Sequence, residues 1–123
     1  MVAFKELNDA VGIADQIQSN EDGSVVLINV FTIDPADEDA LISAWSHDAD
    51  FMKEQPGYIS TQMHKGIGGS STYINYAVWE SVESFRNAFT NPEFQNRIGE
   101  YPSSAVASPH LFKKIAVKGH CVA

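Results

Sequence analysis

The stretch TYINYAVWES, residues 72–81, decides the fold because it combines a complete strand with the start of a helix. Successive side chains of a strand point to opposite faces, so Asn75 and Trp79 share one face. Serine is a preferred N-cap residue, and Ser81 therefore predicts that a helix begins directly after the strand. Because asparagine is depleted in strands, the face with Asn75 and Trp79 is a candidate wall of a binding site.

Two further strands are predicted on the N-terminal side of this stretch. VVLINVFTI, residues 25–33, is rich in β-branched residues and is bounded by polar turns, as expected of a largely buried strand. YISTQMHK, residues 58–65, predicts a second strand. The loop GIGGSS, residues 66–71, joins it to the strand at 72–79, because its glycines disfavour a continuous strand.

Helices are predicted after the first and the third strands. Asp34 and Pro35 fit the N-cap and the first position of a helix that should run to about Glu54, where a Pro-Gly pair follows. The second helical region begins after Ser81 and restarts at Asn91, which precedes another proline. Its apolar residues recur at helical spacing.

The C-terminal part completes the predicted topology. YPSSAVASP, residues 101–109, is predicted to be a long loop, and LFKKIAV, residues 111–117, the final strand. The order β-α-β-β-α-β predicts an α+β, ferredoxin-like split fold, in which a four-stranded antiparallel sheet carries both helices on one face. The other face would be bare, so a homodimer is expected. Residues 1–23 are predicted to form an N-terminal extension of a domain spanning 24–123.

Composition narrows the class of function. With 123 residues, 44% of them hydrophobic and 20% charged, the chain has the size of one globular domain. Its net charge of −8 opposes nucleic-acid binding, and no apolar run is long enough to span a membrane. The N-terminus does not resemble a secretory signal, so a cytoplasmic location is expected. The histidines and the single cysteine, Cys121, lack the spacing of a metal site.

Two asparagines are candidates for ligand binding. Asn29 shares a strand face with apolar residues, as Asn75 does on its own strand. A buried amide without a hydrogen-bond partner costs about 1–3 kcal/mol, so each amide needs a partner. Together they could hold a carbonyl or phenol oxygen. The alternative is that each bonds to a neighbouring side chain or to water.

Three titratable or charged residues are further candidates. Asp48 falls in the middle of an apolar helix face that includes Trp45, where a carboxylate could act as a general base; otherwise it reaches solvent. His64 could be an acid or base if its strand face lines a pocket, and is otherwise an exposed sheet histidine. Arg97 could stabilise an anionic intermediate, or form a salt bridge with a neighbouring glutamate.

The segments QPGYISTQMHKGIGG and YINYAVWESVESFRNAFTNPEF, with the order of elements, resemble the antibiotic biosynthesis monooxygenase family over residues 24 to 118. The resemblance implies a dimeric α+β barrel with a ligand cleft between the helices and one sheet face. It also implies oxidation of phenolic, anthrone or quinol compounds by molecular oxygen without a metal or organic cofactor. Asn75 and Trp79 match active-site positions of the actinorhodin-pathway branch, and Phe85 stands where that branch has a tyrosine.

The resulting hypothesis is a cofactor-independent monooxygenase that acts on a small aromatic substrate. One alternative is a non-enzymatic dimeric binding or stress-response protein. Another is a haem-binding or haem-degrading member, although Ala88 and Ile98 occupy the positions of that branch's helix tryptophan and ligating histidine. The expected catalytic residues are Asn75, Trp79, His64 and Arg97, and the expected substrate-binding residues are Asn29, Phe85, Trp45 and Asp48.

Overall fold

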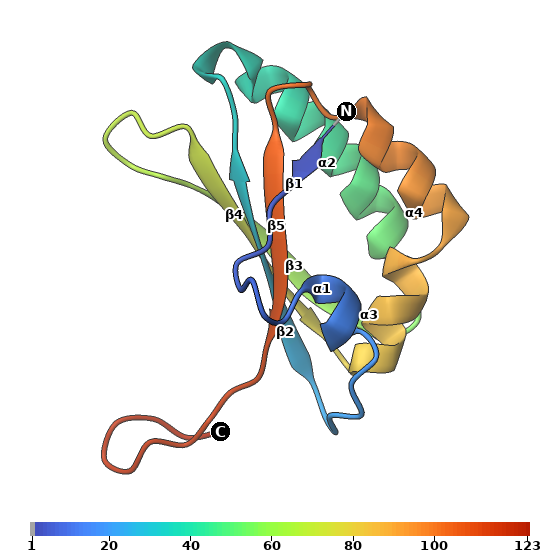
Figure 1. Cartoon of the computed structure of the whole chain (residues 1–123), viewed down its shortest axis with the longest axis vertical. Coiled ribbons are helices and arrows are strands. Elements are labelled where there is room, and N and C mark those ends of the chain that lie inside the picture. Colours follow the sequence, from blue (N-terminus) through green and yellow to red (C-terminus); the bar gives the residue numbers. More distant parts are fainter. Residues whose placement is uncertain (1) are drawn as a thin grey trace.

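The computed structural model describes residues 2–123, and at its centre is a five-stranded sheet with helices on one face (Figure 1). The spatial order of the strands is β1-β5-β2-β4-β3. The four long strands pair antiparallel, and only β1 pairs parallel with its neighbour. The α+β, ferredoxin-like class is therefore confirmed, with one short strand added at the sheet edge. The strands are β1 (Ala3–Phe4), β2 (Val25–Thr32), β3 (Tyr58–Lys65), β4 (Thr72–Trp79) and β5 (Val106–Phe112).

The helices begin where their capping residues predict. The Asp34 carboxylate accepts a hydrogen bond from the Ala36 backbone N–H at 3.0 Å, and Ser81 Oγ accepts one from the Ser84 N–H at 3.0 Å. The region after Asp34 starts with a 3₁₀ turn before it becomes α-helical, and it ends two residues earlier than predicted. The helical elements are α1 (Ile13–Gln16), η1 (Pro35–Asp37), α2 (Glu38–Met52), α3 (Val82–Phe89), α4 (Pro92–Arg97) and η2 (Ile98–Glu100).

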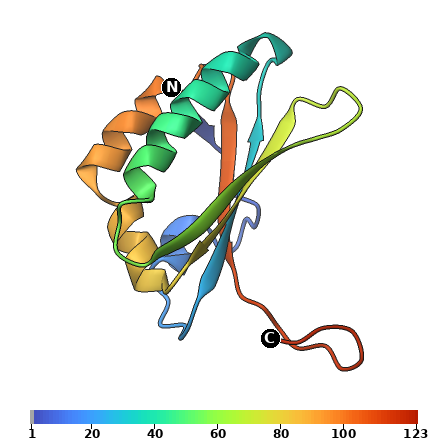
Figure 2. The same ribbon diagram turned by 180° about the vertical axis from the view of Figure 1, so that it is seen from behind.

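The core lies between the sheet and the helices α2, α3 and α4, which cover the same sheet face (Figure 2). One cluster of buried side chains gathers around Leu41 and Phe31, and a second gathers around Trp79 and Phe85. Alternation along β2 and β4 sends one set of side chains into this layer and the other set to the opposite face. The core is therefore built on one side of the sheet only.

The position of β5 differs from the prediction. The strand spans Val106–Phe112, whereas a loop was predicted up to Pro109 and a strand from 111 to 117. Proline lacks an N–H and is confined to strand positions that need no ladder bond. Ala107 accepts a hydrogen bond on the β1 side of β5, and Leu111 bonds there to the Gln16 side chain. Pro109 lies two residues from both Ala107 and Leu111, so its nitrogen faces the same β1 side of the strand. No hydrogen bond from β5 to β2 is therefore lost at the proline.

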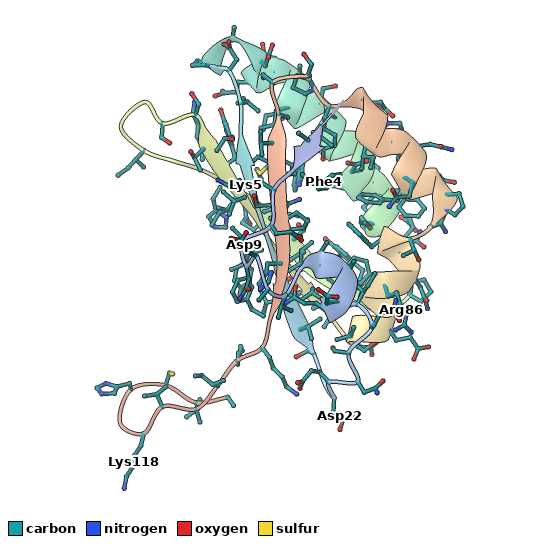
Figure 3. The ribbon with its side chains drawn as sticks, viewed as in Figure 1. Phe4, Lys5, Asp9, Asp22, Arg86 and Lys118 are labelled. Carbon is teal, nitrogen blue, oxygen red and sulfur yellow. The ribbon has the colours of Figure 1, made fainter. Side chains whose placement is uncertain are left out.

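The N-terminal segment is joined to this edge of the sheet. The Ala3 N–H donates to the Ala105 carbonyl at 2.9 Å, and the Lys5 N–H donates to the Ala107 carbonyl at 2.9 Å. Further along, Arg86 of α3 donates from Nη1 to the Ile17 carbonyl at 2.9 Å (Figure 3). Residues 2–18 therefore lie against β5 and α3.

The residues after Lys113 form an arm that extends away from the sheet, and Lys118 lies at its far end (Figures 1 and 3). The arm folds back on itself through a bridge between Val117 and Cys121, whose thiol is exposed. Among residues 2–123, no helix has the length and apolar character needed to cross a membrane.

Candidate active site

A cavity lies between the sheet and the helices. Its empty volume is about 710 Å³, part of which is open to solvent. The lining residues are Val2, Phe4, Leu27, Asn29, Phe31, Trp45, Asp48, Ala49, Met52, Tyr58, Thr61, Asn75, Ala77, Trp79, Phe85, Phe89, Phe94, Ile98, Tyr101, Ala107 and Pro109.

Aromatic rings form one wall of the cavity in an unbroken series. Trp79 meets Tyr58 edge-on at a centroid distance of 5.6 Å and Phe85 at 5.8 Å. Phe85 stacks on Phe89 at 5.2 Å, and Phe89 lies 5.6 Å from Phe94. Rings at these separations attract one another, and a cavity lined by aromatic rings favours a ligand with a ring of its own. The wall is suited to a flat, electron-rich ligand.

Polar side chains reach the cavity from neighbouring strands of the sheet. Asn29 and Asn75 are directly opposite each other in the β2–β4 register. Asn75 Oδ1 accepts a hydrogen bond from the Thr61 hydroxyl, which leaves its NH₂ group free to donate to a ligand. Asn29 Oδ1 and Trp79 Nε1 are both buried, and neither has a hydrogen-bond partner within residues 2–123. The sheet therefore presents two unused polar atoms and one available amide.

Asp48 faces the same cavity from α2. Its side chain is 5% exposed, and neither carboxylate oxygen has a hydrogen-bond partner in the described chain. Burial raises the pKa of Asp48 to about 6. The nearby Tyr101 hydroxyl lowers this pKa in part, although it stands outside regular hydrogen-bond geometry, and Glu100 raises it further. The pKa of Tyr101 is raised, mainly by burial and to a smaller extent by the negative charge of Asp48, so this phenol stays protonated.

Two of the expected catalytic residues lie outside the cavity. His64 is exposed and pairs with Ile74, whereas its neighbour Met63 pairs with Asn75 on the cavity side. The cause is a β-bulge between Tyr58 and Ser60, which inverts the alternation that the sequence suggests for β3. His64 therefore does not line the cavity, and the alternative of an exposed sheet histidine describes its position.

Arg97 is held on the outer surface of the helices. Its Nη2 lies 3.2 Å from the Glu93 carboxylate, its Nη1 donates to the His47 carbonyl at 2.5 Å, and its guanidinium lies 5.5 Å from the Phe51 ring centroid. The salt bridge that was the alternative interpretation is present. Arg97 does not line the cavity, so the structure does not support direct contact with a ligand there.

The other six candidates all line the cavity: Asn29, Trp45, Asp48, Asn75, Trp79 and Phe85. Their functional roles remain predictions. Sequence reasoning missed Thr61 and Tyr101. Thr61 faces the cavity only because of the bulge in β3, and Tyr101 does so from the turn after η2. The placement of Thr61 has no signal in simple alternation, whereas Tyr101 follows Phe94 and Ile98 at helical spacing, and all three line the cavity.

The chain offers little for holding a metal or haem in this cavity. None of its four histidines is among the lining residues, and residues 2–123 contain no cluster of three or more His, Cys, Asp or Glu side chains suited to a metal ion. Ile98, where a haem-ligating histidine would be expected from the resemblance, contributes an apolar side chain. The lining residues therefore include no histidine or cysteine that could be the axial ligand of a haem.

Comparison with known proteins gives consistent similarities. Residues 24–98 match the sequence model of a family described as antibiotic biosynthesis monooxygenase. Deoxynogalonate monooxygenase of Streptomyces nogalater is 29% identical over 84 residues, which are 67% of this chain and 66% of that protein. SnoaB of the same organism, a cofactor-independent oxygenase, superposes with a TM-score of 0.68 at 24% identity, over 80% of this chain and 99% of SnoaB. A Shewanella loihica protein thought to be a monooxygenase is 32% identical to this chain and superposes with a TM-score of 0.68. The superposition covers 80% of this chain and 100% of that protein.

Proposed function

Because the chain belongs to the antibiotic biosynthesis monooxygenase family, we propose that it is a cofactor-independent monooxygenase acting in the cavity described above. Its substrate would be a small aromatic compound of the phenol, quinol, anthrone or polyketide type, and its oxidant would be molecular oxygen. The names given to the Streptomyces nogalater matches, a monooxygenase and a cofactor-independent oxygenase, support this class of reaction. The match spans 66% of deoxynogalonate monooxygenase, so the substrate of that protein is not transferred to this chain.

The observation that carries the proposal is the pair of unused buried atoms in an aromatic cavity. Trp79 Nε1 can only donate a hydrogen bond and Asn29 Oδ1 can only accept one. A buried polar group without a partner costs about 1–3 kcal/mol, so a ligand that supplies both partners recovers this loss. A hydroxyl group both donates and accepts. A flat aromatic compound with a hydroxyl group would fit this combination.

The same atoms suit the expected chemistry. When a hydroxyaromatic substrate loses a proton, negative charge appears on its oxygen, and Trp79 Nε1–H and the Asn75 NH₂ group can stabilise that charge. The electron-rich anion can then reduce molecular oxygen. For an anthrone methylene, one oxygen atom forms the new carbonyl, and the other leaves as water with the two hydrogens of the methylene. The substrate thus supplies all four electrons that reduce the oxygen molecule and both protons of the water.

We expect Asn75→Ala to lower the rate of oxygen uptake at least tenfold, because one donor to the developing oxyanion is lost. An oxygen electrode with a panel of anthrones and quinols would measure kcat and KM for each. The loss should fall mainly on kcat, since the donor acts on charge that develops during the reaction. Asn87→Ala, on the exposed side of α3, is a matched control and should behave as the wild type.

Analysis of the reaction products can contradict the monooxygenase proposal. If aerobic and anaerobic incubations give the same products with every compound of the panel, the monooxygenase proposal is wrong. Binding of these compounds without any oxygen uptake would instead favour a non-enzymatic binding protein that uses the same cavity.

We also propose that two copies of the chain associate through the sheet face opposite the helices. The central strands place partly exposed apolar side chains on that face, among them Ile28, Ile74, Val78 and the 38% exposed Tyr76. Apolar side chains from adjacent strands form a continuous surface, which is typical of a protein contact. A second copy would cover an identical surface about a twofold axis.

Sedimentation equilibrium is expected to give twice the 13.5 kDa mass of the chain. Ile74→Glu should convert the dimer to monomer, because it places a charge in the apolar contact. Ile42→Glu, on the exposed side of α2, adds the same charge on the helical side and should leave the mass unchanged. A wild-type monomer at micromolar concentration would contradict the proposal.

A further inference from the structure

The buried carboxylate of Asp48 has no structural role that explains its position. It lies on the core-facing side of α2 with 5% of its surface exposed, and neither oxygen is hydrogen-bonded within residues 2–123. Burying an unpaired charge is costly, and charged side chains inside proteins are usually paired. None of the ion pairs within residues 2–123 involves Asp48. Asp48 is therefore available to a ligand.

The cavity presents different polar groups on its two sides. The sheet provides the Trp79 indole N–H and the Asn75 amide, both of which donate hydrogen bonds. The helix α2 provides an ionised carboxylate, which accepts hydrogen bonds only. A substrate hydroxyl has one proton, and when this proton goes to the helix side rather than to Asn29 Oδ1, the donors from the sheet can stabilise the oxygen that is left.

We propose that Asp48 is the catalytic base of this site and accepts the proton that a phenolic or enolisable aromatic substrate gives up on binding. This inference rests on the proposed function. It implies that the substrates carry an acidic hydroxyl group. In the step, the substrate O–H bond breaks and its electron pair remains on the substrate oxygen. The proton forms a new O–H bond with an Asp48 oxygen, so that a carboxylic acid and an aromatic oxyanion result.

The surroundings of Asp48 agree with this role. A general base is most effective when its pKa is close to the working pH, and the pKa of Asp48 is about 6. The titratable and charged groups that act on it are the Tyr101 phenol, Glu100, Arg97 and His47. Tyr101 remains protonated because its own pKa is raised, and His47 is engaged with Glu100 at 2.8 Å. Asp48 is thus the cavity's titrating carboxyl group.

The test uses para-nitrophenol, whose yellow anion and colourless neutral form are distinguished by visible absorption. The probe is bound to the full-length wild type and to Asp48→Asn at about pH 6.5, where free Asp48 is mostly ionised. In the wild type we expect the bound probe to be mainly the anion. We also expect infrared difference spectra to show the carbonyl band of a protonated carboxylic acid appearing on binding. In Asp48→Asn the carboxylic acid band should be absent, because no carboxylate remains at this position to take up the proton of the probe.

Asp50→Asn serves as the matched control, since Asp50 is an exposed carboxylate on the same helix. It should give wild-type spectra. A carboxylic acid band that persists in Asp48→Asn would overturn the inference, as would a wild-type protein that binds the probe without producing this band.

The measurement needs no oxygen, so this inference and the proposed function fail separately. A protein that ionises the probe through Asp48 but never consumes oxygen would contradict the monooxygenase proposal alone. A protein whose oxygen uptake is unchanged by Asp48→Asn would contradict the role of Asp48 alone.

Discussion

The Phe85→Ala variant is expected to lose about 3–5 kcal/mol of unfolding free energy, the range for truncating a fully buried phenylalanine. Phe85 has no exposed surface, and its ring lies between Trp79 at 5.8 Å and Phe89 at 5.2 Å. Removing the ring deletes contacts on both sides and leaves a space that the flanking rings of strand and helix cannot easily fill. Urea unfolding followed by circular dichroism would measure the loss.

Phe112→Ala is the control for this prediction, because Phe112 is 42% exposed at the end of β5. Its truncation should cost much less than that of Phe85. Equal losses for the two variants would mean that the aromatic series does not support the cavity wall. Phe85→Leu, which retains most of the volume, should fall between the wild type and Phe85→Ala.

The Asp48→Asn variant is expected to be more stable than the wild type at pH 7.5 by about 3 kcal/mol, and equally stable near pH 4. The pKa of Asp48 is about 6 in the folded protein against an ordinary value of 3.8. The difference is roughly two pH units, at 1.36 kcal/mol per unit. Between these two values the folded state binds more protons than the unfolded state, so wild-type stability falls as the pH rises from about 4 to 6. Above pH 6 the full cost of the buried charge remains.

Urea unfolding of both proteins across this pH range would measure the difference. Subtracting the two curves removes the contributions of other groups. Among these is Glu38, whose pKa is lowered by hydrogen bonds from Lys65 and Tyr73 and whose effect on stability has the opposite sign. A difference that does not change between pH 4 and 7.5 would contradict the buried, unpaired state of Asp48. A confirmed difference would show that the wild type retains this carboxylate at a cost in stability.

Most of the fold could be predicted from the sequence because its signals are local. The bounds of β3 and β4 agree with the predicted strands, and Asp34 and Ser81 cap the helical regions as expected. The error at β5 arose from Pro109. Whether proline fits a strand depends on which edge its nitrogen faces, and this is set by pairing partners distant in the sequence.

The candidate site was predictable to the extent that alternation holds. The placement of Asn29, Asn75 and Trp79 on one side of the sheet follows from the period of two in β2 and β4. His64 was misplaced because a single bulge shifts β3 by one residue, and one residue exchanges the faces. Helical spacing placed Asp48 on the core side of α2, but only packing reveals that its oxygens lack partners.

The outer edge of β5 is blocked against pairing with strands of other protein molecules, which matters most in a crowded solution. Exposed strand edges are templates for edge-to-edge aggregation, because their free N–H and C=O groups can pair with strands of other molecules. Here β1 covers the start of the edge, Pro109 has no N–H to offer, and the Gln16 amide bonds both the N–H and the carbonyl of Leu111. The template is interrupted at successive positions along the strand. The N-terminal segment and Pro109 thus hinder strand addition at this edge of the sheet, an effect independent of any chemistry in the cavity.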